Sequence, residues 1–297
     1  AMVYRKGMSA LIDSYNWFPD GDGEGLIAFY TRHCEFCQDQ VLMSSDDEGL
    51  TWTKRVRIPQ SICTNEGYQD CRDPEIFPIK KDGEKVTMWG MILSSVSKKT
   101  CWFLKSSDLV NWSYAGEFPM FYPECISIID EDDKDGITRQ IIMFSSRYYI
   151  VGNITYNEST GRIDFIDLNN RSLSSYTADT LPLETMDYAA DSYACQSFYI
   201  DDPNSKYFGK DISLNWFSGV PNSDRSAESG MFAQARTNWN GSGMTIPVEL
   251  GLNDSFELTQ KPITIDNEDL NKTNVVDIEN VEYEDIFVEY NNNLSII

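Results

Sequence analysis

Short apolar runs of strand length recur along the whole chain and constrain the fold more than any other feature. Helical periodicity is scarce, and clusters such as DGDGEG, DDEG, KKDGE and EDDKDG, which are typical of hairpin turns, separate the runs. The runs are GLIAFYT, QVLMSS, KVTMWGMIL, CWFLKSS, QIIMFSS, YYIVGNITY, RIDFIDL, SFYID and ISLNWFS. Runs of this length bounded by turn residues predict an all-β fold.

An internal repeat narrows the architecture. The segment SSDDEGLTW resembles SSDLVNW further along the chain, and in each a strand ending in Ser-Ser-Asp leads to a tryptophan that begins the return strand. We expect Asp46 and Asp108 to accept backbone N–H bonds in these turns, and Trp52 and Trp112 to pack between neighbouring sheets. Four-stranded sheets that repeat at roughly 40–50 residues indicate a β-propeller. Two copies alone leave a β-sandwich as the alternative.

The charge balance limits the partners. The chain has 297 residues with 47 acidic and 24 basic side chains, and its net charge is −23. Such a field repels phosphate backbones and anionic membrane surfaces, so we expect neither nucleic acid nor a membrane as partner. Neutral substrates fit better. The sequence contains no apolar run near the ~20 residues that a membrane helix needs.

Cysteine and histidine usage argues against a metal or cofactor. The seven cysteines are an odd, scattered set that does not resemble a disulfide framework. Cys34 and Cys37 form a Cys-x-x-Cys pair beside His33, the only histidine, but no second ligand pair accompanies them. Structural zinc takes four ligands, so we expect no metal, and we expect no cofactor. A single histidine also argues against a His-based catalytic triad.

Two carboxylates lie in apolar, strand-like surroundings. Asp73 stands beside Arg72 in YQDCRDPEIFPI, and Glu124 lies in PMFYPECISII. Glycoside hydrolysis needs paired acids, and the inner strands of a propeller converge on a funnel where distant acids can meet. Wrapping of Glu124 by Phe121, Tyr122, Cys125 and Ile126 would favour its protonated form, which suits a general acid. Arg72 should keep Asp73 ionised. The alternative is that both acids cap strand ends or pair with buried arginines.

A third polar cluster lies in DYAADSYACQSFY. Its polar members are Asp187, Asp191, Tyr193 and Gln196. Carboxylate, phenol and amide groups alternate here with small residues, as they often do on strands that face a sugar. An ordinary half-buried strand is the alternative.

Four segments carry a family resemblance when they are taken together. CRDPEIF contains an Arg-Asp-Pro motif, and YPECISI contains a Glu-Cys motif. DYAADSYACQSF is similar to an Asp-Tyr-x-x-Asp-x-Tyr-Ala-x-Gln pattern, and NWNGSGMTIPVEL to a closing Trp-x-Gly-x-Met-Thr-x-Pro-x-Glu-Leu strand. In this order the four resemble glycoside hydrolase family 32, the invertase, levanase and inulinase group. The resemblance covers about residues 7 to 265.

The resemblance implies a five-bladed β-propeller, usually followed by a β-sandwich. It also implies retaining hydrolysis of terminal β-D-fructofuranosides such as sucrose, fructo-oligosaccharides, levan or inulin. Glu124 would then be the acid/base, and Asp73 the transition-state stabiliser that holds fructose hydroxyls with help from Arg72. Pro74 would fix the backbone so that Asp73 faces the funnel. The further substrate-binding residues would be Cys125, Asp191, Tyr193 and Gln196.

The sequence departs from the family's pattern in several places. The family's nucleophile is the aspartate of an Asn-Asp-Pro-Asn-Gly motif, and this string does not occur in the sequence. NWFPDGDGEG precedes GLIAFYT, so Asp20 and Asp22 are expected to be turn residues. KGMS stands where the family has Phe-Ser-Gly-Ser. We expect a propeller with an incomplete first blade over residues 1–252, then a closing strand, a linker or the start of a β-sandwich over 253–297.

An open propeller would expose strand edges, so we expect a complementing segment or an oligomer to cover them. Two other functions stay open. One is a carbohydrate-binding remnant of the family without its nucleophile. The other is a glycosidase from a related five-bladed family that acts on arabinan or xylan, although the Glu-Cys pair and the MTIPVEL strand argue against it. No sequence feature indicates the particular fructoside or the localisation.

Overall fold

The computed structural model describes residues 2–5, 25–34, 37–47, 49–59, 70–81, 85–145, 147–187, 192–217 and 243–263. Apart from one short 3-10 helix, η3 (Leu173–Ser175), the regular elements of these residues are β-strands. The all-β prediction is therefore confirmed. No helix among the described residues is long and apolar enough to cross a membrane.

The strands form four antiparallel sheets, which we call the first to fourth blades. The first blade contains β1 (Met2–Arg5), β2 (Leu26–Cys34), β3 (Cys37–Ser45) and β4 (Thr53–Ile58). The second contains β5 (Arg72–Lys81), β6 (Lys85–Ser95), β7 (Thr100–Ser106) and β8 (Ser113–Pro119). The third contains β9 (Ile126–Asp132), β10 (Thr138–Phe144), β11 (Tyr148–Asn157) and β12 (Arg162–Asp167), with β13 (Glu184–Thr185) pairing with β11. The fourth contains β14 (Ser192–Tyr199), β15 (Asp211–Phe217), β17 (Val248–Leu252) and β18 (Leu258–Pro262), with β16 (Gly243–Met244) pairing with β15.

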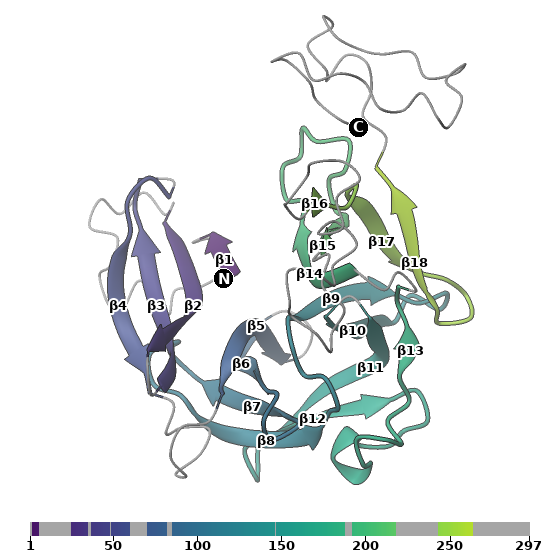
Figure 1. Cartoon of the computed structure of the whole chain (residues 1–297), viewed down its shortest axis with the longest axis horizontal. Coiled ribbons are helices and arrows are strands. Elements are labelled where there is room, and N and C mark those ends of the chain that lie inside the picture. Colours follow the sequence, from purple (N-terminus) through teal and green to yellow (C-terminus); the bar gives the residue numbers. More distant parts are fainter. Residues whose placement is uncertain are drawn as a thin grey trace, which may run out of the picture.

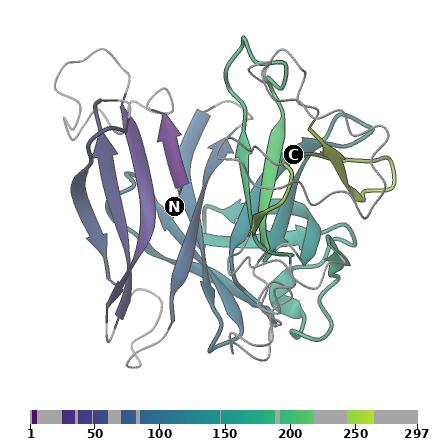
Figure 2. The same cartoon turned by 45° about the horizontal axis from the view of Figure 1, so that its top comes forward.

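The blades stand side by side in an arc in chain order, with the first and fourth at its two ends (Figures 1 and 2). The first strand of each blade is its innermost, and β5 packs against β1 and β9, which in turn packs against β14. The prediction of an all-β propeller is confirmed, and the described residues form four of the five blades that the resemblance implies. The 252/253 division stays a prediction. It falls between β17 and β18, which pair as neighbours in the fourth blade.

Three apolar cores hold neighbouring blades together. The core between the second and third blades is rich in aromatic rings, and Phe118 meets Phe144 with ring centroids 6.3 Å apart. A Cβ built on Gly90 of β6 would lie 2.1 Å from Cε2 of Phe77, so this ring can lie over β6 only because position 90 is glycine. Each inner blade thus buries both faces of its sheet, which explains why its strands read as nearly continuous apolar runs. Representative members of the other two cores are Phe29, Leu42, Trp89 and Leu104, and Ile141, Met143, Tyr149 and Leu250.

The repeated turns match the prediction for one aspartate and not for the other. Asp108 accepts N–H bonds from Val110 and Asn111, at 3.0 and 2.7 Å. In the first copy Asp47, not Asp46, has this role and accepts the N–H of Thr51 at 2.8 Å. β3 ends at the second serine of its Ser-Ser pair and β7 at the first, so the acid two residues after the strand end is Asp47 in the first copy and Asp108 in the second. The assignment of Asp46 was therefore wrong.

The tryptophans that follow the turns donate their indole N–H back into them, Trp52 to the carbonyl of Gly49 and Trp112 to that of Leu109. Trp112 also meets Phe29 of the first blade edge to face, with centroids 5.9 Å apart. This confirms that Trp112 packs between sheets. For Trp52 the same placement stays a prediction.

The sequence predicted no disulfide framework, and the structure departs from this prediction at Cys71. Cys71 is disulfide-bonded, whereas Cys101, Cys125 and Cys195 are free. Within the described ranges, no group of three or more His, Cys, Asp and Glu side chains is arranged to hold a metal ion. Asp20, Asp22 and the KGMS segment lie outside the described residues.

Candidate active site

The predicted site residues lie where the inner strands of three blades begin. Arg72 and Asp73 start β5, Glu124 and Cys125 immediately precede β9, and Tyr193 is the second residue of β14. These strands pack side by side, and their amino-terminal ends lie next to one another. Residues that are far apart in the sequence thereby share one polar cluster.

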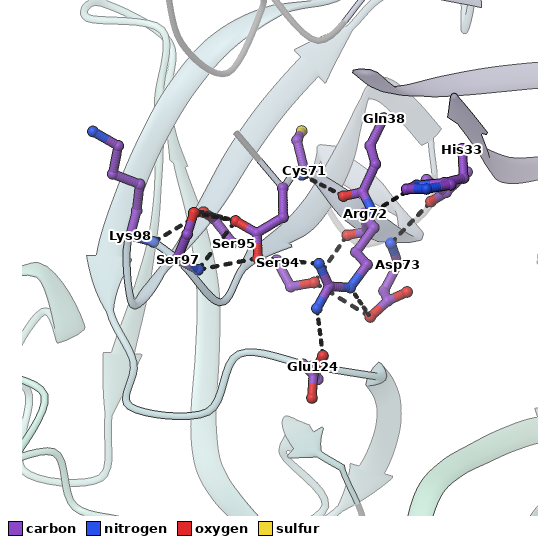
Figure 3. Close-up of polar contacts among 12 residues, drawn as sticks. His33, Gln38, Cys71, Arg72, Asp73, Ser94, Ser95, Ser97, Lys98 and Glu124 are labelled. Atoms are coloured by element: carbon purple, nitrogen blue, oxygen red, sulfur yellow. Dashed lines mark hydrogen bonds and ion pairs between the residues drawn. The ribbon is translucent and has the colours of Figure 1, made fainter. Parts of the chain in front are cut away.

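Arg72 is the centre of this cluster (Figure 3). Its Nη2 donates to Oε1 of Glu124, its Nη1 donates to Oδ2 of Asp70 at 3.1 Å, and its Nε lies 4.0 Å from Oδ2 of Asp73. Burial works against the charge, but the hydrogen bond and attraction from Glu124, with Asp73 and Asp70, outweigh it and raise the pKa of Arg72. One guanidinium therefore links three carboxylates from two blades.

Glu124 receives two donors, and its surroundings are more polar than the sequence suggested. Oε2 accepts the hydroxyl of Tyr193, and Oε1 accepts Arg72. Phe121 and Tyr122, which were expected to wrap it, are 40% and 41% exposed and meet each other edge to face. The predicted apolar wrapping is therefore only partial, because these two rings are exposed to solvent, whereas Cys125 is half-buried and Ile126 is buried.

The backbone of Glu124 is held as firmly as its side chain. The carbonyl of Glu124 accepts the N–H and the hydroxyl of Ser145, at 3.0 and 2.9 Å. Ser145 directly follows β10 of the same blade and is buried. The segment that carries Glu124 is thus tied to its own sheet.

Asp73 is fixed by contacts to three blades. Its Oδ2 accepts the backbone N–H of Cys125 at 2.9 Å and the hydroxyl of Ser94 at 3.3 Å. Its own N–H donates to Oγ1 of Thr31, on β2, at 3.1 Å. The Asp73 carboxylate is therefore bonded to the residue that directly follows Glu124, which brings the two acids to one place.

The inner strands reach this geometry through the same backbone irregularity. Asp73, Cys125 and Ala194 have φ values of 58°, 48° and 54°, in the left-handed region that non-glycine residues rarely adopt. The register shifts between Arg72 and Glu75 and again in β14. Bulges of this kind re-aim side chains near active sites. Pro74 lies inside the first bulge, where its missing N–H costs no ladder bond.

Cys125 and Tyr193 have perturbed acidities. Burial, followed by the charges of Asp73 and Glu124, raises the pKa of Cys125 to about 12. Burial and the hydrogen bond to Glu124 also raise the pKa of Tyr193. Both groups therefore stay protonated near neutral pH, so Cys125 is a poor nucleophile and Tyr193 is a stable donor.

Three predicted residues remain, Gln196, Asp187 and Asp191. Gln196 lies three residues beyond Tyr193, past the bulge, and is exposed. Asp191 lies outside the described residues, and Asp187 is half-buried at the end of the segment before β14.

Several cluster members were not found from the sequence. Trp216 of β15 is 38% exposed and packs on Tyr193, with ring centroids 6.4 Å apart. The polar residues that were missed are Thr31, Asp70, Ser94 and Ser145. Asp70, Ser94 and Ser145 stand at or beside strand ends, where serine and aspartate are common, and Thr31 lies within β2, so composition gave no signal for them.

Comparison with known proteins gives a family match over most of the chain. The model described as "Glycosyl hydrolases family 32 N-terminal domain" matches residues 8–262. A levanase of Bacillus subtilis (strain 168) is 35% identical over 112 residues, which is 37% of this chain and 15% of the levanase. A fructan beta-fructosidase of Streptococcus mutans is 24% identical over 277 residues, which is 91% of this chain and 17% of that protein. This chain thus spans less than a fifth of either relative.

Solved structures agree on the fold. Exo-inulinase from Aspergillus awamori superposes with a TM-score of 0.56 at 20% identity, covering 88% of this chain and 53% of that one. Fructofuranosidase from Schwanniomyces occidentalis, solved with fructose, gives a TM-score of 0.51 at 19% identity, covering 82% and 44%. At these identities the likeness shows the fold alone.

Proposed function

Because this chain belongs to glycoside hydrolase family 32, we propose that it takes part in retaining hydrolysis of terminal β-D-fructofuranosides. The substrates would be sucrose, fructo-oligosaccharides, levan or inulin. The observation that carries the proposal is the link made by Arg72 between the carboxylates of Asp73 and Glu124. The curated relatives with fructan-cleaving names support the substrate class.

Glu124 is proposed as the acid/base. It would protonate the glycosidic oxygen as the bond to the fructosyl carbon breaks, and later take a proton from the attacking water. Between these steps it is a carboxylate, which the two donors Arg72 and Tyr193 support. Its backbone hydrogen bonds to Ser145 would keep it aligned through both steps.

Asp73 is proposed as the transition-state stabiliser. An oxocarbenium-like transition state gains positive charge on the sugar, and a fixed carboxylate beside it is favourable. The N–H of Cys125 and the hydroxyl of Ser94 hold one oxygen of Asp73, which leaves the other for fructose hydroxyls. Arg72, Cys125 and Tyr193 would complete the pocket, and Asp191 and Gln196 stay proposed substrate contacts. Trp216 adds an exposed ring on which a sugar face could stack.

A second candidate function is carbohydrate binding without turnover. A retaining mechanism needs a nucleophile in addition to the acid/base, and the family's Asn-Asp-Pro-Asn-Gly string does not occur in this sequence. The described residues assign no third carboxylate to that role. A pocket that keeps Asp73, Arg72 and Glu124 could still bind fructose.

Calorimetry with fructose and sucrose, beside a hydrolysis assay, separates the two functions. For a hydrolase, wild-type protein both binds and cleaves, and Glu124→Gln binds but loses activity by about a hundredfold or more, since general acid catalysis supplies roughly that much. Binding by wild type without cleavage supports the second function. Normal turnover by Glu124→Gln would contradict the proposed role of Glu124.

A further inference from the structure

Asp70, two residues before Arg72, accepts hydrogen bonds from three residues. Its carboxylate accepts the N–H of Ser97 with both oxygens at 3.0 Å, the hydroxyl of Ser95 at 3.0 Å, and the hydroxyl of Ser97 (Figure 3 shows the two serines). It also accepts Nη1 of Arg72 at 3.1 Å. Burial opposes its charge, yet the bonds from Ser97 and Ser95 and the attraction of Arg72 together lower the pKa of Asp70.

Asp70 contacts the Arg72 guanidinium at Nη1, whereas the two candidate catalytic acids lie near Nη2 and Nε. A guanidinium is planar and rigid, so a partner on one of its nitrogens fixes where the others point. Asp70 takes Nη1, which leaves Nη2 for Glu124 and Nε toward Asp73. Asp70 is in turn held by the Val96–Lys99 turn that joins β6 to β7, so its own position is set by the second blade.

We propose that Asp70 is a positioning residue that fixes the plane of the Arg72 guanidinium and so holds the Arg72–Glu124 contact between two blades. This inference rests on the proposed function for its catalytic consequence. Without Asp70, Arg72 could rotate about its side-chain bonds and pair with either acid. A misplacement of about 1 Å in such a site can cost a hundredfold in rate.

A purely structural role is the competing explanation, because Asp70 also anchors the β6–β7 turn. Two observables separate the roles. Rotation of the Arg72 guanidinium, followed by side-chain NMR, reports on positioning. A fall in kcat per folded molecule with little change in KM, with the folded fraction measured by circular dichroism, reports on catalytic alignment.

The test compares Asp70→Asn with Asp133→Asn. Asp133 is a matched control: it also accepts backbone N–H groups of a turn, from Asp135 and Ile137, and pairs with Nε of Arg139 at 2.8 Å. It follows β9, whereas Glu124 precedes that strand, so it lies at the opposite strand end. Asp70→Asn is expected to release Arg72 rotation and to lower kcat about tenfold to a hundredfold. Asp133→Asn is expected to do neither.

A second control isolates the turn. Ser95→Ala combined with Ser97→Ala removes two hydroxyl donors to Asp70 and leaves its pair with Arg72. We expect Arg72 to stay restrained and kcat to change less than threefold. An equal loss in this double variant and in Asp70→Asn, with Arg72 restrained in both, would overturn the inference.

The two proposals can fail separately. If wild type does not cleave fructosides but Asp70→Asn releases Arg72, the positioning role stands and the proposed hydrolysis fails. If wild type cleaves and Asp70→Asn matches it, the positioning role fails. If Asp70→Asn does not fold, Asp70→Glu takes its place, because it keeps the charge but displaces it. Asp70→Glu should show a smaller change in Arg72 rotation and kcat in the same direction. If Asp70→Glu has the Arg72 rotation and the kcat of wild type, the inference is contradicted.

Discussion

At the scale of single residues, the cluster depends on donors that surround two carboxylates. Arg72 and Tyr193 donate to Glu124, while Ser94 and the N–H of Cys125 donate to Asp73. Hydrogen bonds to charged groups contribute about 1.5–3 kcal/mol each, roughly twice the neutral value. Orientation of the acids is therefore a property of their partners as much as of the strands.

Removing one donor should show this. Tyr193→Phe deletes the hydroxyl that bonds Glu124 and keeps the ring that packs on Trp216. We expect kcat for fructoside hydrolysis to fall about tenfold, since one charge-assisted hydrogen bond is lost. Tyr199→Phe, an exposed tyrosine of the same strand, is the control and should retain activity. Equal activity of the two variants would show that the Tyr193 hydroxyl has no role.

How much of the site the sequence could predict follows from the same contacts. Asp73 and Glu124 were found because charged residues inside apolar strands are unusual. The wrapping of Glu124 was predicted only in part, because adjacency in sequence does not say where Phe121 and Tyr122 point. Asp70 and Thr31 act across a bulge or between blades, and no local pattern encodes such contacts.

At the scale of elements, the inner strands combine a regular fold with irregular starts. Strand lengths and turns were readable from alternation and from Asp- and Gly-rich breaks. The bulges at Asp73 and in β14 were not, because left-handed φ values at non-glycine residues are set by tertiary contacts. The error at Asp46 arose because β3 ends at the second serine of its Ser-Ser pair and β7 at the first, so Asp47 is the counterpart of Asp108.

Packing of inner strands also buries acids away from the site. Asp211, which begins β15, is 9% exposed, and burial together with the charges of Glu131 and Asp130 raises its pKa to about 7. Glu75 of β5 is fully buried, which raises its pKa as well. Both acids lie between blades, so they couple the packing of blades to pH.

We expect the contribution of Asp211 to stability to fall as pH rises from about 4 to 7. The folded-state pKa of Asp211 is above the unfolded value of about 3.9, so in this range the folded state binds more protons, and the free energy of unfolding decreases with pH. Three pH units at 1.36 kcal/mol each set an upper limit of about 4 kcal/mol.

Asp211→Asn should remove this pH-dependent contribution to the free energy of unfolding. Urea unfolding at pH 5 and pH 8 is expected to show a smaller difference in unfolding free energy for the variant than for wild type. Asp179→Asn, at an exposed position, is the control and should keep the wild-type difference. If Asp211→Asn keeps the full wild-type pH dependence of the unfolding free energy, other groups cause that dependence.

At the scale of the whole molecule, the arc of blades brings three strand starts together. Contacts from the second blade to the third and from the third to the fourth place Arg72, Glu124 and Tyr193 in one cluster. The blades are covered at their shared faces by apolar cores, so the polar cluster is confined to their ends. The expectation that a complementing segment or an oligomer covers the edges of the arc stays a prediction.

The most direct test is a crystal structure of Glu124→Gln soaked with sucrose or a fructo-oligosaccharide. The account predicts a terminal fructofuranose ring with hydroxyls on Asp73 and Arg72 and with its glycosidic oxygen beside the side chain at position 124. A fructose ring bound away from both positions, or no bound sugar at concentrations that saturate wild type in calorimetry, would contradict it.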